Sequence, residues 1–244
     1  MDKELQQKIL ESGHNLHLRV ASDLENEGWD VELASYYVDD LSDKPREIDI
    51  VAEMPFHGGS VSDGSLEEIF RTRLFIECKH FKTPIALRTL PIDISEAHES
   101  IVTHTLGKTS SDIWGDRHHY AKPRVAKLWT TMEERNDPFF DGLASTTKSL
   151  LYYLGTRASR GIFYPVLVYD GIDGMYEIQG SDLSNLESAP LVKRALVSFN
   201  YAYNEVFTNK PRRRPLLIDV VHSDELPTLI KEVMKEGERA ITKL

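Results

Sequence analysis

Residues 74–80, LFIECKH, constrain the fold of this chain more than any other segment does. Leu74, Phe75 and Ile76 form an apolar run typical of a buried strand, and Glu77 and Lys79 follow two positions apart. Side chains at positions i and i+2 of a strand point to the same face. The pattern therefore predicts a rigid, largely buried strand that presents a carboxylate and an ammonium group side by side.

A second apolar run, REIDIVAE at 46–53, carries a lone acid, Asp49, at its centre. Burying an unpaired charge costs roughly several kcal/mol, so the charged groups of both runs need a partner. Two carboxylates and a lysine on neighbouring strands could hold a divalent cation and a water molecule. Glu and Lys also alternate on ordinary exposed strands, so it is the apolar surroundings and the preceding acid that favour a site.

Composition bounds the class of protein. The chain has 244 residues, which fits one large domain, and 41% hydrophobic with 28% charged residues is typical of a globular protein. No apolar run approaches the roughly 20 residues of a membrane helix, and the opening MDKELQQKIL does not read as a signal peptide, so we expect no membrane association. Cys78 is the sole cysteine, which excludes an internal disulfide and favours a cytoplasmic location.

The formal net charge of −10 argues against indiscriminate binding to nucleic acid. It is compatible with a local basic groove, because phosphate binding depends on charge clustered on one face.

Hydrophobic spacing predicts the order of the elements. An amphipathic helix over 3–27 ends at Gly28, and three strands with short connections favour an antiparallel meander at 30–38, 46–53 and 69–80. Residues 93–150 read as a helical insertion with breaks at Gly107, Gly115 and Pro123. The remaining expected elements are a helix at 139–154, a strand at 162–171 with a hairpin partner at 175–180, a helix at 190–206, a strand at 215–222, and a closing helix capped by Ser223.

Three segments carry a family resemblance: GHNLHLRVASDLENEGWDV (13–31), REIDIVA (46–52) and FIECKH (75–80). In this order they resemble the PD-(D/E)xK nuclease superfamily, in the branch of Mrr-type and archaeal Holliday-junction-resolvase-like nucleases. The resemblance implies an α/β fold with a restriction-endonuclease-like core of helix, three-stranded meander, helix and strand. The expected organisation is a single domain over 1–244, with the catalytic motifs in 1–92, a helical insertion at 93–150, and the rest of the core with a strand and helix extension in 151–244.

The resemblance also assigns roles. Asp49 and Glu77 would bind Mg²⁺, or Mn²⁺ in its place, and Lys79 would be catalytic. The backbone carbonyl of Cys78 is well placed as a further ligand, while its side chain should point away from Glu77 and Lys79 into the core. Relatives often carry a glutamate on the first helix where this chain has His17. His17 could bind the metal or act as a base, an ordinary helix-face histidine is the alternative, and Glu11 could replace the missing carboxylate.

Basic residues with interleaved aromatic residues suit contacts with phosphates and bases. One basic stretch surrounds Tyr120 and Trp129, with a solvated helix face as the alternative, and another precedes the strand at 215–222, with an exposed loop as the alternative. The nucleic-acid candidates are Lys82, Arg117, His118, His119, Lys122, Arg124, Arg212, Arg213 and Arg214. Asp219 lacks a following E-x-K triplet, so we interpret it as a structural or interface acid.

We therefore expect a Mg²⁺-dependent endonuclease or exonuclease that hydrolyses phosphodiester bonds. On grounds of resemblance, DNA is preferred over RNA, the protein is a homo-oligomer, and it acts in restriction or anti-phage defence with a protein partner. The alternative is a catalytically inactive subunit of the same fold that binds nucleic acid or a protein in a defence assembly.

Overall fold

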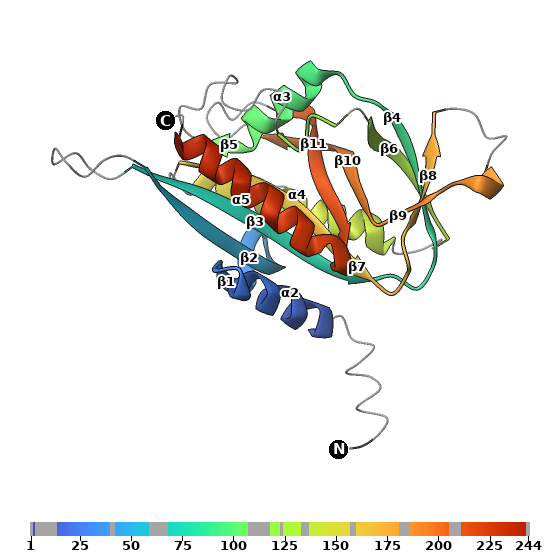
Figure 1. Ribbon diagram of the computed structural model, residues 1–244, viewed down its shortest axis with the longest axis horizontal. Helices are drawn as coiled ribbons and strands as arrows, with labels where there is room; N and C mark the ends of the chain where they lie inside the picture. The colour runs from blue at the N-terminus through green and yellow to red at the C-terminus, as the bar shows by residue number, and fades with distance from the viewer. Residues whose placement is uncertain are drawn as a thin grey trace.

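The computed structural model describes residue 2 and residues 14–39, 42–58, 68–106, 118–122, 124–132, 137–156, 160–180, 186–204 and 211–242 (Figure 1). The side chains of 14, 68, 106, 202–204 and 211–214 are outside this description. The first part of the helix expected over 3–27 also lies outside it, and so do Gly107, Gly115 and Pro123.

In the described residues, 11 strands form one mixed sheet at the centre of the molecule, so the fold is α/β as expected, although the sheet is larger than the predicted core. Its strands are β1 (Asp30–Asp39), β2 (Lys44–Gly58), β3 (Glu68–His80), β4 (Ile85–Pro91), β5 (Thr105–Leu106), β6 (Arg124–Thr131), β7 (Gly161–Asp170), β8 (Met175–Gln179), β9 (Leu191–Val192), β10 (Arg194–Asn204) and β11 (Pro211–His222). They follow the order β1-β2-β3-β7-β11-β10-β6-β4-β8-β9, and β5 pairs with β7.

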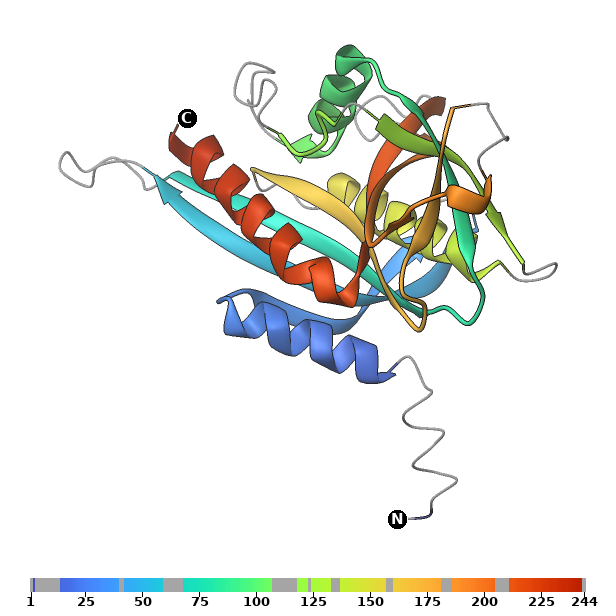
Figure 2. The same ribbon diagram turned by 45° about the vertical axis from the view of Figure 1, so that its right-hand side comes forward.

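Helices cover both faces of the sheet. The described helices are α2 (His14–Asn26), α3 (Ile94–Thr103), α4 (Pro138–Thr156) and α5 (Leu226–Thr242). Apolar residues of α2, α3 and α5 share one core with one face of the sheet, whereas α4 packs against the opposite face. Figure 2 shows α5 lying along the hairpin of β2 and β3, with α2 beside it. No helix in the described ranges is both long and apolar enough to cross a membrane.

The predicted meander is confirmed, because β1 pairs antiparallel with β2 and β2 pairs antiparallel with β3. β7 then joins β3 in parallel, with Ile76 opposite Val166. The chain reaches β7 through α4, after β4, α3, β5 and β6 have been added. Helix α2 ends as predicted at Gly28, whose φ of +87° is the left-handed cap conformation, and Trp29 N donates to Leu24 O at 3.1 Å.

Four expectations about the second half of the chain are wrong. Ser223 does not cap the closing helix, because it begins a short 3₁₀ helix that His222 caps, and α5 starts at Leu226. β6 and β10 are strands where helices were expected, and β8 is not the hairpin partner of β7. Both edges of β7 are occupied by β3 and β11, so no edge is left for β8, which pairs instead with β4 and β9. β10 pairs with β11 from Arg194 to Asn204, and such long-range pairing overrides a local helical pattern. The insertion is therefore only partly helical.

The contact between β3 and β7 leaves no room for a side chain at Gly161. A Cβ there would lie 2.1 Å from the backbone oxygen of Arg71 on β3. We predict that Gly161→Ala lowers the free energy of unfolding by about 1–3 kcal/mol, because backbone atoms cannot rotate away as a side chain can. Urea unfolding measures the loss, with Glu238→Ala at an exposed position of α5 as control. A variant as stable as the control would contradict this packing.

Candidate functional site

Strand β2 changes the face it presents at Asp49. Ile50 belongs to the core under α2 and α5, whereas Ile48 belongs to the core under α4. Strict alternation would place both on one face. Ala34 lies across from Asp49 on β1, between the pairs Leu33–Ile50 and Ser35–Ile48, and has a positive φ of 54°. This irregularity puts Asp49 at the point where the strand switches between the two layers.

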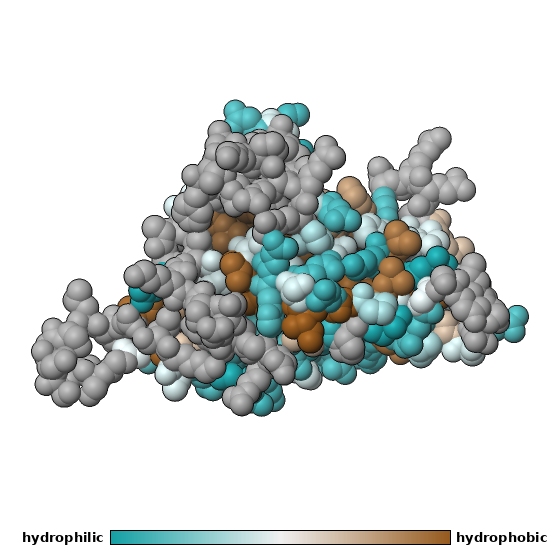
Figure 3. Space-filling view, turned by 90° about the horizontal axis from the view of Figure 1, so that it is seen from above, coloured by the Kyte–Doolittle hydropathy of each residue, from teal (hydrophilic) through white to brown (hydrophobic). Residues whose placement is uncertain are grey.

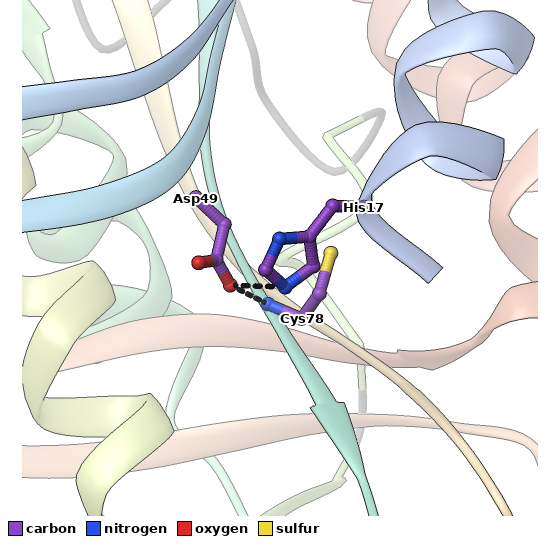
Figure 4. A group of neighbouring side chains, drawn as sticks. All are labelled: His17, Asp49 and Cys78. Atoms are coloured by element: carbon purple, nitrogen blue, oxygen red, sulfur yellow. Dashed lines mark hydrogen bonds and ion pairs between the residues drawn. The ribbon is translucent and has the colours of Figure 1, made fainter. Parts of the chain in front are cut away.

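The side chain of Asp49 hydrogen-bonds to β3 at the point where the backbone pairing of β2 with β3 ends. The backbone ladder between these strands begins at Ile50 and Ile76 and runs to the hairpin. Beyond it, the amide of Cys78 donates to Oδ2 of Asp49 at 2.7 Å (Figure 4). A hydrogen bond to an ionised acceptor is stronger than a neutral one. Asp49 is therefore held against the strand that carries Glu77 and Lys79.

His17 and Cys78 complete one side of the site. Nε2 of His17 on α2 lies 3.1 Å from Oδ2 of Asp49, and this hydrogen bond raises the pKa of the imidazole. The Cys78 side chain is buried in the core under α2, as expected, yet its sulfur also approaches His17 and Asp49. Ligand atoms of the three residues all lie within 4.8 Å of one another (Figure 4).

Glu77 and Lys79 form the other side. Phe75 on the same strand belongs to the core under α4, so alternation directs Glu77 and Lys79 toward that helix. Lys79 Nζ lies 2.6 Å from Oε1 of Glu77. Burial, and next the charge of Asp49, raise the pKa of Glu77 to about 7 despite Lys79. Burial acts to lower the pKa of Lys79, but Glu77 outweighs it and the pKa rises.

The carboxylate oxygens of Asp49 and Glu77 are the kind of ligand that a hard divalent cation binds. Within the described part of the chain, Asp49 makes its contacts through Oδ2 and Glu77 through Oε1. The second oxygen of each carboxylate can therefore act as a metal ligand, and Mg²⁺ is bound through such oxygens. Two acids whose charges repel each other are the arrangement that a bound cation relieves.

A third group of polar residues, which sequence reasoning missed, lies at the ends of β3 and β7. His80 Nδ1 contacts Oδ1 of Asp170 at 2.7 Å, and Arg19 on α2 contacts the other oxygen of Asp170. Asp170 lies at the end of the strand expected at 162–171, and only the parallel pairing of His80 with Asp170 brings the two residues together.

Comparisons of this chain with protein-family models, curated protein sequences and solved structures found no match.

The structure does not support nucleic-acid contacts by His118 and His119. Their side chains are 0% and 5% exposed, and they lie in a turn rather than on a solvated helix face. Nε2 of His119 lies 2.8 Å from Oδ2 of Asp219, and its Nδ1 lies 3.0 Å from Oε2 of Glu236 on α5. Asp219 is therefore the structural acid that we expected. The histidines attach the turn to β11 and α5.

His118, His119 and Glu236 also bring ligand atoms within 4.8 Å of one another, but the hydrogen bonds oppose metal binding. The amide of Tyr120 donates to Nδ1 of His118 at 3.0 Å, so that nitrogen carries no proton. Burial lowers the pKa of His118 to about 3, so the ring is neutral and its proton is on Nε2, the atom that faces Glu236. A metal at Nε2 would displace this proton onto the nitrogen that already faces an amide.

The remaining nucleic-acid candidates divide into three cases. Arg124 donates to the backbone oxygen of Thr89 at 2.6 Å, and burial lowers the pKa of Lys122. Lys82 is exposed beside the end of β3. Arg117 lies outside the described residues, and Arg212, Arg213 and Arg214 are described only as backbone of β11, so their contacts with nucleic acid stay predictions. Glu11, the acid that could replace a missing metal ligand, also lies outside the described residues.

The buried ion pairs of His119 predict a stability effect. Asp219 and Glu236 outweigh burial and raise the pKa of His119 to about 9. The stabilisation is therefore complete below the ordinary pKa and is lost as pH rises through about 9. We predict that His119→Ala lowers the free energy of unfolding by about 3–5 kcal/mol near neutral pH, because two carboxylates lose a buried partner. Urea unfolding of the His119 variant tests this prediction, with His57→Ala at an exposed position of β2 as the control. A loss of unfolding free energy below about 1 kcal/mol in His119→Ala would contradict the prediction.

Glu77 predicts a pH dependence of the same sign as that of His119 but at lower pH, because its pKa is also raised in the folded protein. Its pKa of about 7 in the folded protein lies above its ordinary value, so the ionised carboxylate destabilises the fold as pH rises through about 7. Gln mimics the protonated acid. We predict that Glu77→Gln has a higher melting temperature than wild type at about pH 8 in metal-free buffer. Compared with the same difference at about pH 5, this gain should be larger by roughly 2–4 °C. Exposed Glu238→Gln is the control, and a pH-independent difference would contradict the prediction.

Proposed function

We propose that this protein is a metal-dependent nuclease that hydrolyses phosphodiester bonds, with DNA as the preferred substrate. The observation that carries the proposal is the hydrogen bond from the Cys78 amide to Asp49, which places a carboxylate beside Glu77 and Lys79. Phosphodiester hydrolysis needs an activated water and a neutralised phosphate. A pair of acids with a lysine on one strand supports both requirements.

Each residue has a role that its contacts support. Asp49, Glu77 and the carbonyl of Cys78 would hold Mg²⁺, which supplies charge neutralisation and a more acidic water. Lys79 remains protonated because its pKa is raised, so it donates hydrogen bonds rather than removing a proton. Glu77 fixes the position of the Lys79 ammonium group at 2.6 Å. We assign Lys79 to orienting the water and stabilising negative charge on the phosphate.

The arrangement of the elements supports a restriction-endonuclease-like core. α2, the meander β1-β2-β3, α4 and the parallel strand β7 follow the order that this fold requires. The acid at β2 and the E-x-K triplet on β3 occupy the positions at which the resemblance places the catalytic set. The strands and helix between β3 and α4, and the pair β10 and β11, are then additions to that core.

We also propose, from the family resemblance, that the protein is a homo-oligomer with a role in defence. A homo-oligomer with two sites could cut two strands, and a defence role with a protein partner fits the nuclease branch. The edge strand β1 carries exposed Leu33, Tyr36 and Val38, which suit contact with a second copy. Figure 3 views another face of the molecule, and there the apolar residues that are coloured are interspersed with polar ones.

One observation favours the alternative of an inactive, binding subunit. His17 takes the helix position where relatives often have an acid, and its imidazole contacts Asp49 directly. A protonated histidine there would compete with a cation for the same carboxylate oxygen.

A cleavage assay distinguishes an active nuclease from an inactive binding subunit. Plasmid, linear and single-stranded DNA and RNA are incubated with Mg²⁺, Mn²⁺ or EDTA. We predict metal-dependent cleavage that falls by about 10²–10³-fold in Asp49→Ala and in Lys79→Ala, because each removes a group that stabilises charge in the transition state.

Asp30→Ala and Lys231→Ala are matched controls at exposed positions of β1 and α5. Cleavage by the Asp49 and Lys79 variants at the rate of these controls would show that the site is misassigned. An absence of cleavage on every substrate would support the inactive subunit.

A further inference from the structure

We propose that His17, Asp49 and Cys78 form a binding site for a borderline-soft divalent cation such as Zn²⁺. The three residues supply one nitrogen, one oxygen and one sulfur ligand, converging from α2, β2 and β3 (Figure 4). This set differs from the all-oxygen set that the proposed nuclease needs. The two sets share Asp49, and Cys78 would supply its sulfur to one and its backbone carbonyl to the other.

The distances suit a tetrahedral ion. Zinc binds histidine and carboxylate at about 2.0–2.2 Å and thiolate at about 2.3 Å, which separates the ligand atoms by about 3.3–3.6 Å. Nε2 of His17 and Oδ2 of Asp49 are already 3.1 Å apart. The sulfur of Cys78 lies within 4.8 Å of both, so closure around an ion needs a movement of about 1.5 Å at most.

The ligands are held by rigid elements. Cys78 is in the core, on a strand that pairs on both sides with β2 and β7. Leu16 and Val20, which flank His17 on α2, are buried against the same core. Asp49 is fixed by the backbone amide of Cys78 itself. A site whose ligands are already positioned binds its ion with little loss of conformational freedom.

Burial leaves the site both sheltered and reachable. The side chains of His17 and Asp49 are 21% and 17% exposed, and Cys78 is 4% exposed overall. An ion can therefore enter from the side of His17 while the sulfur stays away from bulk solvent. The fourth tetrahedral position is open to a water molecule.

The chemistry selects the class of ion. Thiolate and imidazole favour Zn²⁺ and Co²⁺, whereas Mg²⁺ and Ca²⁺ prefer oxygen ligands. Binding replaces the S–H proton of Cys78, which passes to the solvent. Nε2 of His17 also gives up its proton, which moves to Nδ1 when the ring is neutral, whereas the imidazolium releases one proton to the solvent. The affinity should therefore rise with pH.

Cobalt provides a direct test that needs no nucleic acid, so its result is separate from that of the cleavage assay. The full-length protein is stripped with a chelator and titrated with Co²⁺, then with Zn²⁺. We expect one equivalent of Co²⁺ to give the intense visible bands of a four-coordinate ion and a near-ultraviolet sulfur-to-cobalt charge-transfer band. Zn²⁺ should abolish both.

Three variants locate the ion. Cys78→Ser should lose the charge-transfer band, and both Cys78→Ser and His17→Gln should weaken Zn²⁺ binding by about 100-fold or more, since even residues outside the ligand set cost about 10–100-fold. His57→Ala, at an exposed position of β2, should bind as wild type does. Circular dichroism confirms that each variant is folded.

Three outcomes would overturn the proposal. Cobalt bound without a charge-transfer band would show that sulfur is not a ligand. Unchanged affinity in both ligand variants would place the ion elsewhere, for example at His119 and Glu236. Failure of the folded wild-type protein to bind either ion would show that the three side chains form only a packing contact.

Discussion

The hydrogen bond from the Cys78 amide to Asp49 is the interaction on which the candidate site depends. It closes the gap where the ladder between β2 and β3 ends, and it fixes a carboxylate next to the triplet on β3. Burial, and next the charge of Asp49, raise the pKa of Glu77 to about 7. Asp49 thereby joins Glu77 and Lys79 on one side to His17 and Cys78 on the other.

The polar centres around His119 and around Asp49 differ in character. Around His119, each carboxylate has a cationic or hydroxyl partner: Asp219 contacts Arg194, and Glu236 accepts from Tyr164 at 2.6 Å. Such a satisfied network fixes a loop and rigidifies the core. Around Asp49, two acids repel each other and the carboxylates keep oxygens for a further ligand. The first centre is suited to stability and the second to binding a cation.

The sequence was informative where a pattern is local. The apolar runs at 46–53 and 74–80, the meander, and the capping role of Gly28 follow from alternation and backbone conformation. Contacts between distant segments were not accessible: nothing local indicates that β7 has both edges occupied, or that His119 lies against Asp219, 100 residues away. Composition alone suggested exposed basic histidines, whereas pairing with buried acids placed them in the core. His17 was recognised as a candidate, but the approach of the Cys78 sulfur depends on how α2 crosses β3.

The central claim is that Asp49 and Glu77 share a cation beside Lys79. The most direct measurement is anomalous diffraction from crystals of the protein soaked in Mn²⁺. We predict an anomalous peak bonded to one oxygen each of Asp49 and Glu77 at about 2.1–2.2 Å, with Lys79 Nζ outside the coordination sphere. Mn²⁺ bound away from both carboxylates, or no peak there while Mn²⁺ occupies another position, would contradict it.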